Sequence, residues 1–133
     1  MFLLDTSVLF AAVYQAHALH EGVSRWLAIG ERYATCGLTQ IGVFRLLLMD
    51  APMHGCPLVV ADAHSVVADF TRTDRHTFLS CPPISPHYVG QTTGNKAAFD
   101  DYLVQIARTA DCTLVTLDRP LANRWPANTL LLQ

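Results

Sequence analysis

The sequence has few charged residues and no long apolar run. Only 15% of its 133 residues are charged and 51% are hydrophobic, which is the reverse of the composition of disordered chains. The longest unbroken apolar run, Val8 to Tyr14, is far shorter than the ~20 residues of a membrane-spanning helix. No basic leader precedes Asp5, so we expect no secretory signal, no membrane partner and a cytoplasmic location.

Paired cysteines and an excess of basic residues are also missing. The four cysteines form no C-x-x-C pair, which speaks against structural zinc or a dithiol redox site and predicts small buried hydrophobic side chains. Nine Lys and Arg residues stand against eleven Asp and Glu, for a formal net charge of −2. Net charge therefore predicts no general affinity for nucleic acid, and any such binding would depend on local basic clusters.

Short apolar runs alternate with capped helical patterns along the whole chain. We expect strands at 2–4, 33–36, 77–79, 113–117 and 129–132, and helices at 8–15, 20–29, 40–49, 59–70, 96–110 and from 119. Thr39 is the expected cap of the 40–49 helix, which is apolar nearly all round and is therefore expected to be buried. This order predicts an α/β fold in a single domain, 1–133, with a central parallel sheet of four to five strands covered by helices on both faces.

Two aspartates follow predicted buried strands directly. Asp5 comes after the first strand and Asp118 after the strand at 113–117, each just before a helix. In an open parallel sheet, ligands bind outside the carboxyl ends of the strands, so both carboxylates are expected at the same edge. Each aspartate taken alone could equally be a simple helix cap.

The adjacent pair Asp100 and Asp101 is separated by helical geometry. Four apolar residues predict one buried stripe of their helix: Phe99, Leu103, Ile106 and Ala110. Because successive residues turn by ~100°, Asp100 lies beside this stripe and Asp101 nearly opposite it. We therefore expect Asp100 at a half-buried site and Asp101 in solvent, although Asp100 could also serve only the helix dipole.

Three carboxylates in one crevice would repel each other, and a divalent cation would remove that penalty. An all-oxygen ligand set favours Mg²⁺ or Mn²⁺ over zinc. Such a site suits the hydrolysis of a phosphodiester. A phosphatase with Asp5 as nucleophile is a weaker interpretation, because that class usually begins D-x-D and position 7 is Ser7.

Four segments, taken in order, resemble the successive motifs of PIN-domain ribonucleases, and most of all the VapC toxins of bacterial toxin–antitoxin systems. They are LDTSVL at 4–9, TQIGVFRLL at 39–47, DDYL at 100–103 and LVTLD at 114–118. The resemblance implies a PIN-like domain and a Mg²⁺- or Mn²⁺-dependent endoribonuclease that acts as a toxin. It also implies an RNA substrate, a cognate VapB-type antitoxin and a homodimer. It assigns the metal-binding acids to Asp5, Asp100 and Asp118, with the hydroxyls of Thr6 and Thr116 in support.

One position departs from the pattern of this family. Its second motif commonly reads T-E-x-G-x-x-R, and here Gln40 takes the place of the glutamate. An amide can accept a hydrogen bond or orient a water, so Gln40 stays a candidate catalytic residue, but it carries no charge and cannot act as a base. The missing negative charge should weaken the binding of a second cation most. The alternative function is a PIN-fold module that binds RNA or protein with impaired catalysis.

Four basic residues are candidates for contact with substrate. Arg45 lies among apolar residues, where it would bind a phosphate, brace an aspartate or extend to the surface. Lys96, Arg119 and Arg124 flank the late acidic positions and are candidates for binding the RNA backbone. Each of them taken singly is equally compatible with solvated surface charge.

Overall fold

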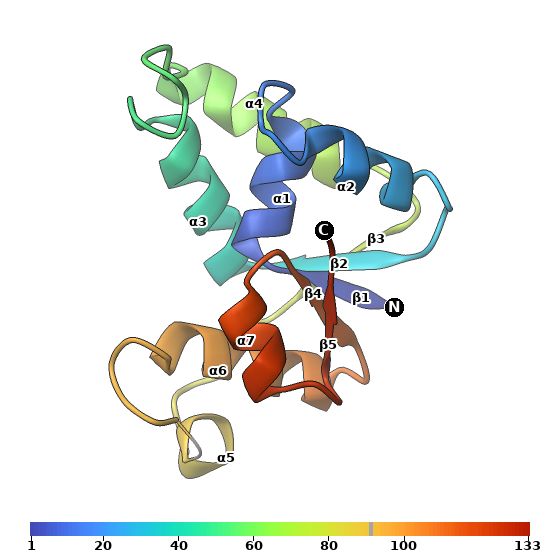
Figure 1. Ribbon diagram of the computed structural model, residues 1–133, viewed down its shortest axis with the longest axis vertical. Helices are drawn as coiled ribbons and strands as arrows, with labels where there is room; N and C mark the ends of the chain where they lie inside the picture. The colour runs from blue at the N-terminus through green and yellow to red at the C-terminus, as the bar shows by residue number, and fades with distance from the viewer. Residues whose placement is uncertain (91) are drawn as a thin grey trace.

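The computed structural model describes residues 1–90 and 92–133, and its centre is a parallel sheet (Figure 1). The strands are β1 (Phe2–Leu4), β2 (Tyr33–Cys36), β3 (His76–Leu79), β4 (Thr113–Thr116) and β5 (Thr129–Leu131). They are ordered β3-β2-β1-β4-β5, and every neighbouring pair is parallel. The predicted α/β fold with a parallel sheet is therefore confirmed.

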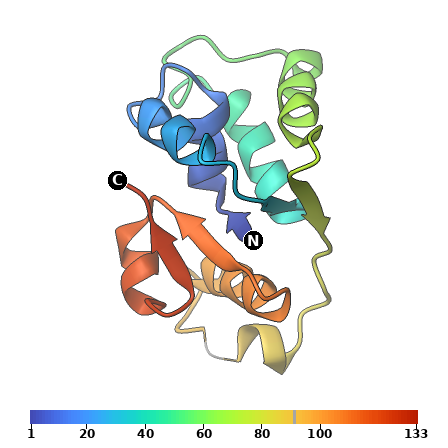
Figure 2. The same ribbon diagram turned by 90° about the vertical axis from the view of Figure 1, so that its right-hand side faces the viewer.

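Helices connect the strands and form a layer on each face of the sheet (Figures 1 and 2). They are α1 (Thr6–Val13), α2 (His20–Leu27), α3 (Gly37–Leu47), α4 (Val60–Thr71), α5 (Pro86–Val89), α6 (Ala98–Thr109) and α7 (Arg119–Arg124). In both views α1 to α4 lie on one side of the sheet and α5 to α7 on the other. No helix in the described ranges is long and apolar enough to cross a membrane.

The alternation of side chains along the strands divides the core into two halves. Leu3 and Leu114 are fully buried against α6 and α7, whereas the next residues, Leu4 and Val115, are fully buried against α1 and α2. This follows from the two-residue period of a strand, which sends successive side chains to opposite faces. A third buried cluster, which includes Val43, joins α1, α3 and α4.

Helix α3 differs from its expected form in its start and its exposure. It begins at Gly37, and Thr39 is not its cap but lies inside the first turn, where its hydroxyl accepts a 3.1 Å hydrogen bond from the backbone N–H of Cys36. The predicted burial on all sides is also wrong, because Ile41 is 59% exposed and Arg45 is exposed. An apolar composition did not reveal the solvent face, since that face carries Ile41.

The cysteines also depart in part from expectation. All four are free thiols, but only Cys36 and Cys112 are buried, whereas Cys56 and Cys81 are exposed. Cys56 lies in the connection between α3 and α4, and Cys81 begins the proline-containing stretch after β3. Connections run over the surface, so a small apolar residue placed in one stays accessible to solvent.

The strand order locates the ligand-binding edge of the sheet. The chain proceeds from β1 outward to β2 and β3, and then returns to the other side of β1 with β4 and β5. The direction of winding therefore reverses between β1 and β4. In such sheets the helices diverge at this switch point and leave a crevice outside the carboxyl ends of the two strands.

Candidate active site

Asp5 and Asp118 lie at the switch point because they follow the two strands that flank it. Leu4 of β1 is paired with Val115 of β4, and the backbone N–H of Asp5 donates a 2.9 Å hydrogen bond to the Val115 carbonyl. Asp5 is also the N-cap of α1, and Asp118 is the N-cap of α7. Each carboxylate therefore caps a helix and also lies at the crevice.

The Asp5 carboxylate is 7% exposed and is held by three donors. Its Oδ1 accepts a 2.7 Å hydrogen bond from the backbone N–H of Thr6. Its Oδ2 accepts bonds of 3.0 Å from the Ser7 hydroxyl and 2.6 Å from the Thr116 hydroxyl. Burial raises the pKa of Asp5, the three hydrogen bonds oppose that shift, and the charge of Asp118 adds to it.

Thr116 connects the two strand-end aspartates. While its hydroxyl donates to Asp5, the same oxygen accepts a 3.0 Å hydrogen bond from the backbone N–H of Asp118. Thr116 is fully buried at the end of β4, so these bonds are shielded from water. Asp118 in turn uses Oδ1 to accept a 3.1 Å bond from the Leu121 N–H in the first turn of α7.

Asp100 reaches the same crevice from α6. Its side chain is half-buried, and burial, followed by the charges of Asp5 and then Asp118, raises its pKa to about 6. The nearby Arg124 guanidinium opposes the rise. Asp100 therefore lies close enough to Asp5 and Asp118, which are distant from it in sequence, for their charges to act on it.

Asp101 does not lie in solvent, contrary to the sequence prediction. It is 3% exposed and accepts hydrogen bonds from Trp125 Nε1 (2.7 Å), Arg124 (3.1 Å) and the Thr92 hydroxyl (2.9 Å). Phe99, a member of the predicted buried stripe, is instead 69% exposed. The buried face of α6 is thus rotated from the predicted one and places Asp101 against the Arg124 guanidinium of α7 and the indole of Trp125, which follows α7.

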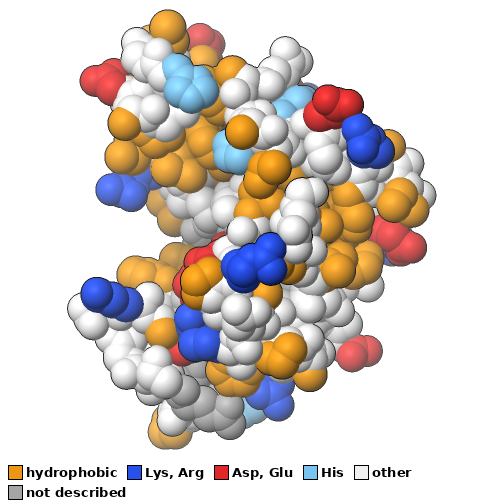
Figure 3. Space-filling view, in the orientation of Figure 1, with side chains coloured by type: hydrophobic (Ala, Val, Ile, Leu, Met, Phe, Trp, Pro, Cys, Tyr) orange, Lys and Arg blue, Asp and Glu red, His pale blue; other side chains and the backbone are white. Residues whose placement is uncertain are grey.

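The basic candidates occupy different positions around the crevice. Arg124 is paired with Asp101, and with Lys96 it lines a cavity of about 350 Å³ at the start of α6. Arg119 is exposed at the first position of α7. Figure 3 shows acidic atoms in the recess between the two helical layers, with Lys and Arg side chains nearby.

Gln40, Thr6 and Arg45 have surroundings that the sequence did not reveal. The Gln40 amide donates a 2.9 Å hydrogen bond to the Thr35 hydroxyl, rather than bonding to one of the three acids. The Thr6 side chain packs against Gly42, and it is the backbone N–H of Thr6 that bonds to Asp5. Arg45 is exposed on α3, which agrees with the alternative that it extends to the surface.

Ser7 is a site residue that the sequence analysis did not single out. Its hydroxyl donates to Asp5 and also accepts a 3.2 Å hydrogen bond from the backbone N–H of Leu117. Ser7 therefore connects the start of α1 to the end of β4. A hydroxyl two residues after a strand-end aspartate is a local signal for such a contact.

The donor chemistry of the three acids fits a hard divalent cation. Carboxylate oxygens are the ligands of Mg²⁺ and Mn²⁺, and a cation would relieve the carboxylate repulsion that adds to the effect of burial on the pKa of Asp100. Within residues 1–90 and 92–133, however, no three His, Cys, Asp or Glu side chains form a group that could by itself hold an ion. Proteins often bind Mg²⁺ with only one or two carboxylates and complete its coordination with water and substrate phosphates.

Comparisons with known proteins give relatives at the level of sequence and of fold. No family model matches the chain. Ribonuclease VapC29 of Mycobacterium tuberculosis is 34% identical over 126 residues, which cover 91% of this chain and 88% of the relative. Among solved structures, Mycobacterium tuberculosis VapC20, described as a sarcin–ricin loop cleaving toxin, superposes with a TM-score of 0.66 at 12% identity, covering 94% of this chain and 95% of the other. VapBC2 from Rickettsia felis, bound to a DNA fragment from its promoter, gives a TM-score of 0.64 at 16% identity, with 99% and 98% covered.

Proposed function

The chain belongs to the VapC family of PIN-domain ribonuclease toxins, and from this premise we propose that it is a Mg²⁺- or Mn²⁺-dependent endoribonuclease whose acidic site is Asp5, Asp100 and Asp118. The observation that carries the proposal is the meeting of two strand-end carboxylates at the switch point, where the Thr116 hydroxyl links Asp5 to Asp118. Burial and the charges of these two acids also raise the pKa of Asp100. Three acids from three segments are costly to gather without a cation. A site that hydrolyses a phosphodiester with the help of a metal ion would need such a cluster of acids.

Each residue of the site has a distinct task in this proposal. Asp5, Asp100 and Asp118 would offer carboxylate oxygens to a cation whose coordination is completed by water and substrate phosphates, and Asp5 is oriented by the hydroxyls of Thr116 and Ser7. When bound there, Mg²⁺ or Mn²⁺ would supply neutralising charge for the phosphate oxygens and a lowered pKa for a water. The chain itself provides a buried, preorganised carboxylate cluster, and its fixed geometry reduces the reorganisation that hydrolysis requires.

In this proposal, basic side chains at the edge of the crevice bind the RNA backbone. Lys96 and Arg124 line one cavity next to the start of α6, and Arg119 is exposed at the start of α7. Phosphate contacts of this kind position a nucleic acid without reading its sequence. We assign the same role to these three residues, with Arg124 shared between RNA and Asp101.

The relatives extend the proposal to partners. VapC20 is described as a sarcin–ricin loop cleaving toxin, and VapBC2 as bound to a DNA fragment from their promoter. We propose an RNA substrate, inhibition by a VapB-type antitoxin, a homodimeric state and action in the cytoplasm. Co-expression of a cognate VapB-type antitoxin should restore growth to cells that the chain alone arrests.

The direct test is cleavage of a mixed RNA substrate by purified protein with Mn²⁺. Wild type should cleave, chelation should stop cleavage, and Asp5→Asn, Asp100→Ala and Asp118→Ala should each abolish it. Asp62→Ala, which removes an exposed acid of α4, is the matched control and should cleave like wild type. Cleavage that persists after chelation or in the three site variants would refute the assignment.

Thermal melts report on the cation independently of turnover. Mn²⁺ should raise the Tm of wild type and of Asp62→Ala, because a ligand that binds only the folded state stabilises it. The three site variants should not respond. RNA binding without cleavage by wild type would instead favour the alternative function, a binding module whose catalysis is impaired by Gln40.

A further inference from the structure

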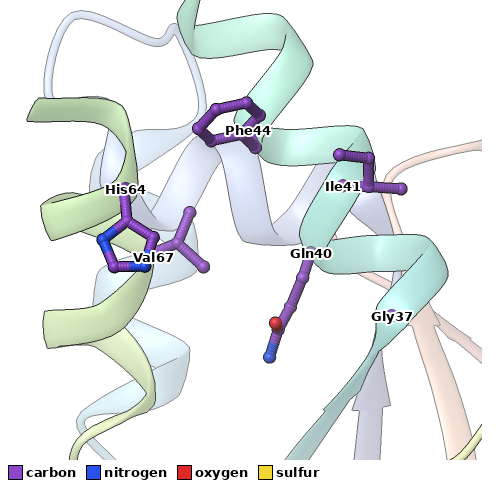
Figure 4. Close-up of a pocket in the computed structure, with 6 residues that line it drawn as sticks. All are labelled: Gly37, Gln40, Ile41, Phe44, His64 and Val67. Atoms are coloured by element: carbon purple, nitrogen blue, oxygen red, sulfur yellow. The ribbon is translucent and has the colours of Figure 1, made fainter. Parts of the chain in front are cut away.

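A cavity of about 330 Å³ lies between α3 and α4, outside the acidic site (Figure 4). It is lined by Gly37, Gln40, Ile41, Phe44, His64 and Val67. Figure 4 shows the Phe44 ring and the His64 imidazole on facing helices, with the Gln40 amide below them. The cavity, named here the α3–α4 cavity, thus combines a largely apolar wall and an aromatic ring with a few polar groups. That combination is typical of small-ligand sites of this size.

The Gln40 amide is held in one orientation by a relay of hydrogen bonds. Its Nε2 donates to the Thr35 hydroxyl at 2.9 Å, and this hydroxyl lies 2.7 Å from His76 Nε2. Burial lowers the pKa of His76, which favours a neutral imidazole that accepts the Thr35 proton. The relay leaves the second N–H and the carbonyl oxygen of Gln40 available to a ligand, and none of the described hydrogen bonds uses them.

Two features relate the α3–α4 cavity to the segment that carries Asp5. Thr35, which accepts the hydrogen bond from Gln40, lies on β2, and β2 is the sheet neighbour of β1, the strand that ends just before Asp5. Gly42 of α3 is in close contact with Thr6, the residue that follows Asp5. The cavity and Asp5 are thus carried by elements that are neighbours in the fold, β2 beside β1 and α3 beside α1.

We propose that the α3–α4 cavity is a subsite for one unpaired nucleobase next to the scissile phosphate of the RNA substrate. The base stacks on Phe44 and exchanges hydrogen bonds with the free edge of the Gln40 amide. Unpaired bases are recognised in this way, by stacking on aromatic side chains and by hydrogen bonds to their edges. This inference depends on the proposed function, and it gives Gln40 a role in reading substrate where the family commonly has an acid.

The test uses a short RNA that wild type cleaves, with an abasic nucleotide placed in turn at each position beside the cleaved bond. Loss of base stacking typically costs roughly 5- to 150-fold. At one position the abasic change should lower kcat/KM of wild type by that factor. Phe44→Ala should lower kcat/KM on intact RNA by a similar factor and no longer respond to the abasic change. Phe44→Leu, which keeps an apolar side chain without a ring, should behave like Phe44→Ala, so that misfolding is not mistaken for loss of stacking.

Phe78→Ala is the matched control, because Phe78 is a 54% exposed phenylalanine on β3 that does not line the cavity. It should retain the abasic response of wild type. The inference is overturned if no abasic position affects wild type, or if both Phe44 variants keep the full response. It is also overturned if these variants cleave normally but lose a protein partner or a second copy of the chain. If wild type does not cleave RNA above Asp5→Asn, the proposed function itself fails.

Discussion

The Thr116 hydroxyl donates a 2.6 Å hydrogen bond to Oδ2 of Asp5, across 111 positions of sequence. The bond exists because β1 and β4 are neighbours in the sheet although they are distant in the chain. This bond orients the Asp5 carboxylate. The same hydroxyl also fixes the backbone of Asp118, because it accepts a hydrogen bond from the Asp118 N–H. A buried hydroxyl thus couples the geometry of two acids.

Thr116→Val should impair the site more than the fold. The substitution removes the donor to Asp5 and leaves the Asp118 N–H without its acceptor, so we expect a loss of about 1–3 kcal/mol in the free energy of unfolding. RNA cleavage should fall by at least about tenfold, because a 1.4 kcal/mol change in transition-state stabilisation is tenfold in rate. Thr113→Val, on the same strand, is the control. Equal cleavage by both variants would contradict a positioning role for Thr116.

The raised pKa of Asp100 predicts a pH-dependent stability. Its folded-state pKa is about 6 against an ordinary value of 3.8, so the folded state holds this proton more tightly. The contribution of Asp100 to the stability of the cation-free protein should therefore be largest below pH 4 and should fall as pH rises from about 4 to 6. Since Asp100 is only half-buried, we expect a contribution of about 1 kcal/mol. Urea titrations of wild type and Asp100→Asn measure it, and an identical pH dependence in both would exclude it.

The same proton competes with the cation. Because a protonated Asp100 cannot bind Mn²⁺ well, the apparent affinity for Mn²⁺ should weaken as pH falls through about 6. Calorimetric titration at a series of pH values gives the affinity directly. Asp62→Ala should follow the wild-type profile, and a flat profile in wild type would show that Asp100 does not bind the ion.

Gly42 is required by the close approach of α3 to α1. A Cβ at this position would lie 2.6 Å from Oγ1 and 2.9 Å from Cγ2 of Thr6. The overlap in Gly42→Ala should cost about 1–3 kcal/mol against the roughly 1 kcal/mol gained in helix propensity, which gives a net destabilisation of up to about 2 kcal/mol. Gly37→Ala on the same helix meets no atom within 4 Å and should be neutral or stabilising. Thr6→Ala should recover part of the loss in the double variant, and no recovery would place the strain elsewhere.

Asp101 holds α6 and α7 together. Asp101→Ala would leave the Trp125 indole N–H and the Arg124 guanidinium without their common acceptor, so we expect a loss of about 2–4 kcal/mol in unfolding free energy. Asp101→Asn keeps an oxygen for Trp125 and should cost less. Urea unfolding monitored by Trp fluorescence measures both. A change within about 0.5 kcal/mol for Asp101→Ala would mean that this network adds nothing to stability.

The sequence determined the elements of this fold and the two strand-end aspartates. Strong apolar periodicity and capping residues act locally, so the order of the strands and of every helix except α5, and the positions of Asp5 and Asp118, follow from neighbouring residues alone. Four ordered motifs identified the family before any contact was known. Helical phase distinguished Asp100 from Asp101, but its prediction that Asp101 lies in solvent is wrong, and the stripe that set this phase wrongly included Phe99.

Only the tertiary structure decided which residues surround these acids. The burial of Asp101 depends on Arg124 and Trp125 at the end of α7, and the orientation of Asp5 depends on Thr116 of β4. Such contacts join segments distant in the chain, and their geometry is set by packing of whole layers rather than by local preference. The sequence pattern shows which residues of a helix share a face with its apolar stripe. Which other segments pack against that face is determined only by the fold.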